Sequence, residues 1–287
     1  FFCVVDLHAV TVPHQPNRLA EDTLSTAALY LACGLDPDRS TVFVQSHVKA
    51  HSELCWLLNC VTPLNWLERM IQFKEKAVKQ GDNVSVGLLD YPVLMAADIL
   101  MFNGGKIPVG RDQIQHVEMA RDIAQRFNHN FEDLFTLPEA IVDDSVAVLQ
   151  GLDGRKMSKS YNNTLPIFGD EKPNKKLIMR IQTDSAAVED SKPTENSVIL
   201  ALYQLFAGGS EYQQMISDYE NGGCGYGDFK KRLAEAYWDY FAPMRARREE
   251  LIANPDEVDS VLAAGAEKAR EEASKVIDRV RKAVGLI

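Results

Sequence analysis

Short apolar runs alternate with helical segments through the first half of the chain, and this alternation restricts the possible fold more than any other feature. Residues 1–5 and 41–44 are compact runs of aromatic and β-branched side chains, which is typical of buried parallel strands. Between them, residues 17–30 carry apolar side chains near helical spacing, and Gly34 marks the expected helix end. The repeated strand–helix order predicts an α/β fold with a Rossmann-like, doubly wound parallel sheet, which binds ligands at the carboxyl ends of its strands.

The pattern changes after Gly169, where strand-like runs end and helical patterns take over. A stretch rich in Gly, Asn and Pro at residues 161–174 is the natural joint. We therefore predict an α/β domain at residues 1–169 and an all-helical domain at residues 170–287, whose long last helix could pack back on the first domain. Helices are expected at residues 54–58, 64–73, 113–127, 198–206, 212–219, 229–241 and 258–284, and a strand or extended segment at 84–89.

The overall charge limits the partners that the chain can have. Its 287 residues contain 31 basic and 41 acidic side chains, whereas a chain that coats nucleic acid is usually basic. We therefore expect no contact with DNA, and any contact with RNA must come from a local patch. No apolar run approaches the roughly 18 residues that a membrane-spanning helix needs. Five irregularly spaced cysteines predict a reduced, cytoplasmic protein, and the opening in mid-strand predicts a further upstream segment.

The strongest local feature is a cationic loop at residues 154–163, which contains the string Lys-Met-Ser-Lys-Ser at residues 156–160. Lysines supply mobile positive charge, and hydroxyl and backbone N–H groups add donors, a combination that suits a polyphosphate. Residues 154–180 hold seven basic side chains against two acidic ones. By composition alone, a solvated linker explains the same residues.

The string Lys-Met-Ser-Lys-Ser resembles the signature loop of class I aminoacyl-tRNA synthetases, which closes over the triphosphate of ATP. Residues 92–100 (Pro-Val-Leu-Met-Ala-Ala-Asp-Ile-Leu) and 109–116 (Val-Gly-Arg-Asp-Gln-Ile-Gln-His) narrow the resemblance to the tryptophanyl-tRNA synthetases of bacterial type. Shorter matches lie at residues 6–11, 72–76 and 265–269. The resemblance runs over essentially the whole chain. It implies a Rossmann-like catalytic domain followed by a helical anticodon-binding domain.

The resemblance also implies that the chain uses ATP to activate L-tryptophan as tryptophanyl-adenylate and then transfers the acyl group to tRNA(Trp). Neither step needs a protein nucleophile, so catalysis is positioning plus stabilisation of charge on the phosphates, with Mg²⁺ bridging pyrophosphate oxygens. Lys156, Ser158 and Lys159 would carry much of that stabilisation. Lys76 resembles a lysine that contacts pyrophosphate, and an ion pair on a helix surface is the alternative for it.

Asp98 lies inside a strongly apolar run, where an unpaired carboxylate is costly and needs a partner. The resemblance implies that Asp98 accepts the indole N–H of tryptophan, and an internal salt bridge or a helix cap is the alternative. The side chains expected to line the apolar slot around the indole, or to hold the α-amino group, are Tyr91, Met95, Ile99, Ile107, Val109, Gln113 and His8. Of these, Ile107 could be plain core and His8 could be structural.

Residues 110–112 lie just before a predicted helix, where a glycine and the first helical amides let a nucleotide approach the backbone closely. The resemblance places the ribose and adenine of ATP there, although Asp112 could instead cap the helix. The residues predicted to bind ATP are Gly110, Arg111, Asp112, Val148, Lys156, Met157, Ser158, Lys159 and Ser160.

The sequence predicts neither a zinc site nor an iron–sulfur cluster. His47, His51 and Cys55 have the spacing of ligands on one helix face, but no fourth ligand follows at a recognisable spacing. Some family members carry a cysteine cluster in the helical half, where this chain has Cys224 alone.

The resemblance further implies a homodimer in which one tRNA reaches across both subunits. The apolar residues 54–70 could supply the dimer face or be buried core. Candidate tRNA contacts, which solvated helix faces explain equally well, are Lys230, Lys231, Arg232, Arg245, Arg247 and Arg248. The sequence contains no His-Ile-Gly-His-like motif, so a non-catalytic paralogue or fragment that binds tryptophan or tRNA is a second interpretation. Tyrosyl-tRNA synthetase is a third, and it would need polar partners for a phenol hydroxyl.

Overall fold

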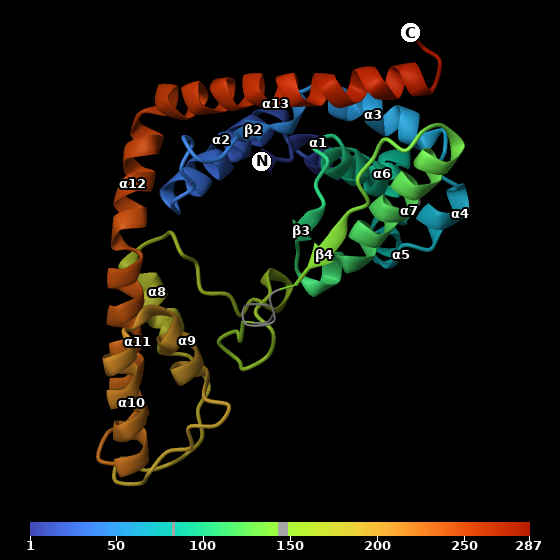
Figure 1. Ribbon diagram of the computed structural model, residues 1–287. Coiled ribbons are helices and arrows are strands. Elements are labelled where there is room, and N and C mark those ends of the chain that lie inside the picture. The colour runs from blue at the N-terminus through green and yellow to red at the C-terminus, as the bar shows by residue number, and fades with distance from the viewer. Residues whose placement is uncertain (82–83, 143–148) are drawn as a thin grey trace. The chain divides into compact units, whose positions relative to one another are not determined.

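The computed structural model describes residues 1–81, 84–142 and 149–287, without the side chains of residues 75, 76, 79, 80 and 160 (Figure 1). The chain forms two compact units, of which the first comprises Phe1–Asp143 with Arg248–Ile287 and the second comprises Asp144–Arg247. The last helix packs in the first unit, and residues 149–169 pack in the second. The functional division at residue 169 stays a prediction.

The first unit contains two pairs of parallel strands. β1 (Phe2–Val4) pairs with β2 (Val42–Val44), and α2 (Pro16–Ala32) lies between them in sequence. Both strands and this helix confirm the predicted strand–helix order. β3 (Lys106–Pro108) pairs with β4 (Glu139–Ile141), and neither was predicted because only the middle residue of each is even partly buried. Parallel pairing brings the carboxyl ends of β1 and β2 to one edge.

Helices make up most of the rest of the first unit. The prediction for residues 84–89 is wrong, because α6 begins at Val86, where the Ser85 hydroxyl accepts the backbone N–H of Leu88 at 3.2 Å and caps the helix. The other elements of this unit are α1 (Asp6–Ala9), η1 (Gln45–His47), α3 (Ala50–Asn59), α4 (Leu64–Glu68), α5 (Ile71–Gln80), η3 (Arg111–Gln113), α7 (Ile114–Asn130) and α13 (Pro255–Ala283).

The long helix α13 packs directly on β2 (Figure 1). Gly265 allows this close approach, because a Cβ at that position would lie 1.8 Å from the carbonyl oxygen of Val42. Small alanines continue the same face of α13 into the core of the first unit. That core also includes fully buried side chains from β2, α3, α6 and α7, among them Phe43, Leu54, Leu58, Leu100, Ile123 and Phe127.

The second unit is helical and has its own core. Its helices are α8 (Glu171–Ile178), α9 (Val198–Phe206), α10 (Gly209–Asn221) and α11 (Tyr226–Tyr240), with the short turn η4 (Lys159–Tyr161) before them. Helix α12 (Ala242–Ala253) crosses from the second unit into the first. The aromatic side chains of Tyr219, Phe229 and Tyr237 are fully buried at the centre of this unit.

The four helices predicted beyond residue 197 are confirmed. α9 has the predicted bounds, and its cap is Ser197, whose hydroxyl accepts the N–H of Leu200. α10, α11 and α13 each begin three residues before the predicted start. Their first turns are polar, so the apolar periodicity alone does not mark them. Across the described ranges, no helix combines the length and the hydropathy that crossing a membrane requires.

Candidate active site

Three side chains from other elements contact the carboxylate of Asp98, which lies near the end of α6. Oδ2 of Asp98 is 2.9 Å from Nε2 of His8, and Nε2 of Gln45 is 2.7 Å from Oδ1 and 2.9 Å from Oδ2. Nδ1 of His51 lies 2.7 Å from Oδ1, off the axis of a hydrogen bond. The carboxylate therefore has the partners that its apolar sequence context requires. The internal-partner alternative is met in part, because two histidine rings lie against the carboxylate.

These partners keep Asp98 ionised. Burial raises the pKa of the Asp98 carboxyl, but the contacts with His51 and His8 outweigh burial and hold this pKa below its ordinary value of 3.8. An ionised carboxylate only accepts hydrogen bonds, so Nε2 of His8 carries the proton between them. The side chain of Asp98 is 14% exposed, which leaves part of the carboxylate accessible to a donor.

The paired ends of β1 and β2 position the residues around Asp98. Asp6 follows β1, and its Oδ1 accepts the N–H of Leu7 at 2.9 Å and the N–H of Ser46, after β2, at 3.0 Å. His8 stands in α1 and Gln45 begins η1. The strand ends thus converge on α6 at the carboxyl edge, where the predicted fold places ligands.

Sequence reasoning missed Gln45 and His51 as members of this cluster. Gln45 directly follows β2, and this position at a strand end is the signal that could have found it. His51 was considered only as a metal ligand together with His47 and Cys55. In the structure His51 faces Asp98, while the Cys55 thiol lies 3.9 Å from Oδ2 of Asp90.

The predicted tryptophan residues of α6 share one helical face. Tyr91, Met95, Asp98 and Ile99 follow at helical spacing and are all partly buried. The Tyr91 hydroxyl is 2.7 Å from Nε2 of His116, and burial raises the pKa of Tyr91 to about 12. The structure therefore places these four predicted residues on one face of α6, and the apolar slot around an indole stays a prediction.

The turn after α6 brings β3 to this face. A Cβ at Gly104 would lie 2.9 Å from Cδ1 of Ile107 and 3.9 Å from Cγ2 of Ile99, so Ile107 and Ile99 both pack at this turn. The chain continues through Val109, whose N–H donates to the carbonyl of Ile141 at 3.0 Å. The strand β3 and the residue after it thus contain the predicted residues Ile107 and Val109, of which Ile107 packs beside Ile99.

The segment predicted to approach the nucleotide forms the turn η3 before α7. Gly110 accepts the backbone N–H of Gln113 at 2.9 Å, and the Gln113 amide donates to Oδ2 of Asp112 at 2.8 Å. The capping role considered for Asp112 is wrong, because Gln113 occupies the N-cap of α7 and no side chain caps there. The side chains of Arg111 and Asp112 are exposed, in agreement with a surface that a ligand can reach.

The cationic loop belongs to the second unit and turns sharply at Gly154, whose φ of +79° favours glycine. Arg155 forms a 2.6 Å ion pair with Asp153 and lies over the ring of Tyr161. Lys156 and Lys159 are exposed, and within the part of the chain that the structure describes neither ε-ammonium has an ion-pair partner. The loop therefore presents two uncommitted cations to solvent.

Asn163, which was not predicted as a site residue, holds the backbone of this loop in place through hydrogen bonds. Its Oδ1 accepts the N–H of Ser158 at 2.8 Å, and its Nδ2 donates to Oδ1 of Asp153 at 2.7 Å and to the carbonyl of Lys156 at 3.1 Å. Asn163 is buried. The Asn163 hydrogen bond is the largest cause that lowers the pKa of Asp153, to about 2. An asparagine at the end of a cationic loop is a weak sequence signal, and its role became visible only in the fold.

Three of the predicted residues cannot be placed in the same detail. Val148 lies outside the described residues. The side chains of Lys76, in α5, and of Ser160, in η4, also lie outside what the structure describes. Their roles stay predictions. Among the residues that are described, no three His, Cys, Asp or Glu side chains group as metal ligands.

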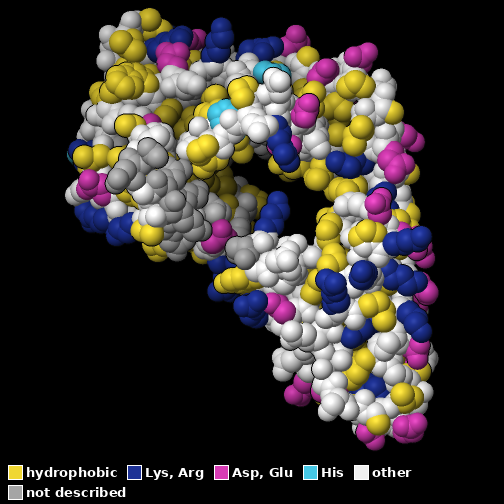
Figure 2. Space-filling model, turned by 180° about the vertical axis from the view of Figure 1, so that it is seen from behind, with side chains coloured by type: hydrophobic (Ala, Val, Ile, Leu, Met, Phe, Trp, Pro, Cys, Tyr) yellow, Lys and Arg dark blue, Asp and Glu magenta, His cyan; other side chains and the backbone are white. Residues whose placement is uncertain are grey.

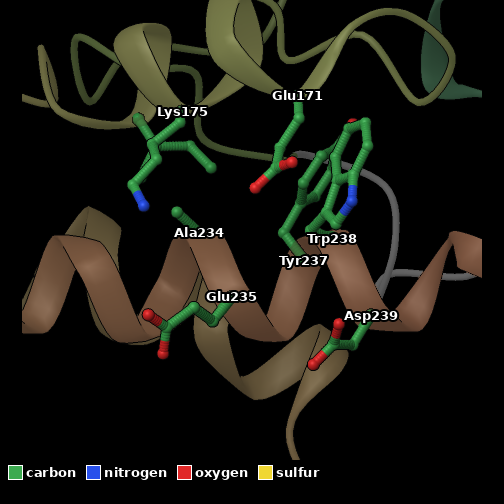
Figure 3. A pocket seen from close by; sticks show the side chains of 8 residues that line it. Glu171, Lys175, Ala234, Glu235, Tyr237, Trp238 and Asp239 are labelled. Carbon is green, nitrogen blue, oxygen red and sulfur yellow. The ribbon is translucent and has the colours of Figure 1, made fainter.

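A small cavity of about 100 Å³ in the second unit lies between α8 and α11 (Figure 3). Figure 3 shows Glu171 pointing from α8 toward α11, beside Trp238. The carboxylates of Glu171, Glu235 and Asp239 outnumber the ammonium of Lys175 around it, so the cavity disfavours phosphate. None of the predicted site residues lines this cavity.

Comparison with known proteins decides the family. Residues 1–242 match the family described as tRNA synthetases class I (W and Y). The chain belongs to this family. It is 52% identical over 298 residues to the tryptophan–tRNA ligase of Parasynechococcus marenigrum, a match that covers 99% of this chain and 88% of that protein. It is 49% identical to the tryptophan–tRNA ligase of Rhodopirellula baltica, over 100% of this chain and 89% of that protein.

Solved structures confirm the predicted fold class. The chain superposes on tryptophanyl-tRNA synthetase from Campylobacter jejuni complexed with ADP and tryptophan with a TM-score of 0.93, at 44% identity over 99% of this chain and 89% of that one. Tyrosyl-tRNA synthetase from Archaeoglobus fulgidus complexed with L-tyrosine gives a TM-score of 0.63 at 19% identity, over 86% of this chain and 79% of that one. The second likeness concerns the fold alone.

Proposed function

We propose that this protein is an ATP-dependent tryptophan–tRNA ligase, which forms tryptophanyl-adenylate and transfers the acyl group to tRNA(Trp). The main support is the ionised carboxylate of Asp98, which three side chains contact and which lies beside the partly buried face of α6. An ionised carboxylate only accepts, and the indole N–H only donates, so the two match. A site built around such a bond rejects amino acids that lack the donor by roughly 10⁴-fold in the best cases. Relatives that are 52% and 49% identical carry the name tryptophan–tRNA ligase.

The other residues of the tryptophan site have distinct roles in this proposal. Met95, Ile99 and Val109 provide apolar and polarisable contacts for the indole ring. Tyr91 and Gln113 hold the α-amino group, and His8 closes the slot from the end of β1. The same site suits L-tyrosine poorly, because an ionised carboxylate beside apolar walls offers one acceptor rather than a donor–acceptor pair for a phenol.

The cationic loop stabilises the phosphates of ATP. Lys156 and Lys159 provide mobile positive charge, and Ser158 provides a hydroxyl donor, while the tryptophan carboxylate attacks the α-phosphorus and pyrophosphate leaves. The nucleotide base and ribose lie against the backbone near η3, and the remaining proposed contacts are Gly110, Arg111, Asp112, Val148, Met157, Ser160 and Lys76.

Mg²⁺ enters this reaction with the nucleotide. The loop offers ammonium and hydroxyl groups rather than carboxylates, so its residues fit the phosphate oxygens and not the cation. When bound, Mg²⁺ would neutralise charge on the pyrophosphate oxygens. Zinc and iron–sulfur chemistry have no place in the proposed reaction, which is expected in the cytoplasm, where tRNA is charged.

The helical half at residues 170–287 is the proposed anticodon-binding part, and the helices α8 to α11 of the second unit belong to it. Residues 144–247 carry 13 basic and 14 acidic side chains, whereas the rest of the chain carries 18 basic and 27 acidic ones, so this unit repels RNA least. Figure 2 shows Lys and Arg side chains gathered over its helices, with Asp and Glu side chains among them. Of the candidates, Lys231 pairs with Asp228, Arg232 pairs with Asp218, and Arg245 stacks on Trp238. The remaining candidates of α11 and α12 are Lys230, Arg247 and Arg248, of which Lys230 approaches the carbonyl of Met179 and Arg248 the hydroxyl of Ser25.

A homodimer is the proposed assembly. Within residues 54–70, Leu58, Leu67 and Met70 are buried core, but Trp56 and Leu64 are 67% and 60% exposed. These two exposed apolar side chains are the candidates for a dimer face. Sedimentation is expected to give twice the monomer mass of 32.1 kDa, and Trp56→Lys is expected to give the monomer. A monomeric unaltered protein contradicts this assembly.

Amino-acid-dependent ATP–pyrophosphate exchange tests the proposed reaction. L-Tryptophan should support exchange and L-tyrosine should not, and tRNA(Trp) should accept the product. Lys159→Ala should slow exchange strongly with little change in tryptophan affinity, because Lys159 acts on phosphate. Lys268→Ala, which removes an exposed lysine of α13, is the matched control and should leave the rate unchanged. Tryptophan binding without exchange would favour the non-catalytic interpretation, and exchange driven by tyrosine would favour a tyrosyl-tRNA synthetase.

A further inference from the structure

The network around Asp98 contains two buried residues that no substrate role has been given. We propose that Gln45 and His51 are positioning residues, which hold the Asp98 carboxylate in one orientation and so set the selectivity for a substrate that has a ring N–H. This inference rests on the proposed function, in which Asp98 accepts the indole N–H. Neither residue needs to touch the substrate in order to act through Asp98.

Gln45 is fully buried, and its amide has one possible orientation. Oε1 of Gln45 accepts the backbone N–H of Leu7 at 3.1 Å, so Nε2 must face Asp98. Nε2 lies between the two carboxylate oxygens, at 2.7 and 2.9 Å. A rotation of the amide would place Oε1 against the carboxylate and Nε2 against an N–H group, which leaves both unsatisfied. Gln45 therefore fixes the orientation of the Asp98 carboxylate relative to the backbone that follows β1 and β2.

His51 is also fully buried, and its ring packs against two aromatic rings. Its ring stacks on Phe43 with centroids 5.9 Å apart and tilts against Phe102 at 5.7 Å. Nδ1 lies 2.7 Å from Oδ1 of Asp98, and among the described residues Nε2 has no hydrogen-bond partner. The aromatic rings exclude water, so the contact with the carboxylate is strengthened by the low local dielectric. Asp98 is thus the polar group against which the structure places this ring.

Three side chains hold the carboxylate through four contacts, of which that from His51 is off the axis of a hydrogen bond, so one acceptor position on Oδ1 remains for a further donor. An ionised carboxylate has about four acceptor positions. Gln45, His51 and His8 approach three sides of Asp98, and part of its side chain remains exposed. A carboxylate that is held still can present the remaining position to the indole N–H at every encounter. One that rotates would turn toward water, and it would lose the geometry that separates an N–H from a ring atom without hydrogen.

The test compares two ligands that differ in one ring atom. L-Tryptophan and 3-(1-benzothiophen-3-yl)-L-alanine have nearly the same shape, but sulfur replaces the N–H in the second. The measured quantity is the ratio of their dissociation constants, determined by calorimetry on the whole protein. Gln45→Leu and His51→Leu are each expected to lower the preference for tryptophan by about tenfold or more, since a hydrogen bond to a charged group is weakened. Gln15→Leu and His14→Leu change exposed residues of the same types and should leave the ratio unchanged.

Conservative variants separate positioning from folding. His51→Asn restores a donor near the place of Nδ1 and is expected to recover most of the preference that His51→Leu loses. Gln45→Glu keeps the shape of the side chain, but it places an acceptor against Asp98 and is expected to lower the preference as Gln45→Leu does. Thermal unfolding of each variant shows which ones are folded. Because the readout is a ratio for folded protein, a general loss of stability does not change it.

The outcomes for Asp98→Ala distinguish the inference from the function on which it rests. If Asp98→Ala keeps the wild-type ratio, Asp98 does not read the N–H and that part of the proposed function is wrong. If Asp98→Ala abolishes the preference while the Gln45 and His51 variants retain it, with both affinities reduced equally, those two residues only support the fold. That second result would overturn the inference.

Discussion

Asn163 holds the backbone of the cationic loop through side-chain hydrogen bonds. The rate of the proposed reaction should depend directly on these bonds. Asn163→Ala removes three side-chain hydrogen bonds, which join this buried residue to Asp153, to the carbonyl of Lys156 and to the N–H of Ser158. An alanine at this position leaves these groups without their partner. The two lysines of the loop then lose the fixed backbone that directs them.

The expected magnitude follows from the number of bonds. Each hydrogen bond contributes about 1 kcal/mol net, so the ordered loop should be destabilised by about 3 kcal/mol. At 1.36 kcal/mol for each factor of ten, this corresponds to about a 100-fold loss of the ordered loop. Where the ordered loop is needed for adenylate formation, the rate should fall by up to this factor. Tryptophan affinity should change little, because Asp98 and its partners belong to the first unit.

ATP–pyrophosphate exchange and tryptophan binding measure these two effects separately. The matched control is Asn162→Gly, which alters an exposed neighbour whose φ of +52° glycine adopts without strain. The control should stay within about twofold of the unaltered rate, since glycine at this φ changes stability little. An Asn163→Ala protein that exchanges pyrophosphate as fast as the control would refute the reasoning, because the loop would then keep its geometry without Asn163.

Two further predictions concern stability. Gly265→Ala should lower the free energy of unfolding by more than about 3 kcal/mol in urea titrations, because the added methyl group would collide with the backbone of Val42 in β2. The control, Ala263→Gly on the exposed face of α13, should lower it by only about 1 kcal/mol. Equal losses for the two variants would contradict the packing of α13 on β2. Asp153 has a pKa of about 2 in the fold against an ordinary 3.8, so its ionised form stabilises the fold above pH 4 and this stability is lost as the pH falls through 2. Asp153→Asn should flatten the pH dependence of unfolding in that range, and an unchanged slope would show that the carboxylate has no such role.

Most of the fold was predictable because the relevant information is local. The helix at residues 198–206 was predicted with its observed bounds, since a serine cap and a continuous apolar run lie next to one another in the sequence. β1 and β2 were predictable from their β-branched and aromatic residues. The stretch at residues 84–89 was not, because its apolar residues suit a strand or a helix equally until the Ser85 cap is recognised.

In the candidate site, too, features encoded by neighbouring residues were predictable, and contacts between distant residues were not. The Lys-Met-Ser-Lys-Ser loop is contiguous, so its chemistry can be read from neighbouring residues. Asp98 is conspicuous because a carboxylate in an apolar run needs partners. His8, 90 residues from Asp98, was expected near it from the resemblance alone, whereas Gln45, 53 residues away, and His51 were not predicted. The structural roles of Asn163 and Gly265 could be recognised only from the backbone segments that they contact in the folded structure.

The amino-acid order already specifies which chemical groups this protein has: a carboxylate that must be satisfied, two lysines in a glycine-containing loop, and apolar stripes with helical or strand spacing. The folded chain specifies which groups meet. Parallel pairing of β1 with β2 brings His8 and Gln45 to one edge, and packing of α3 and α6 adds His51 and Asp98. These contacts depend on burial and on distances of about 3 Å between residues remote in sequence, and such distances exist only after the core has formed.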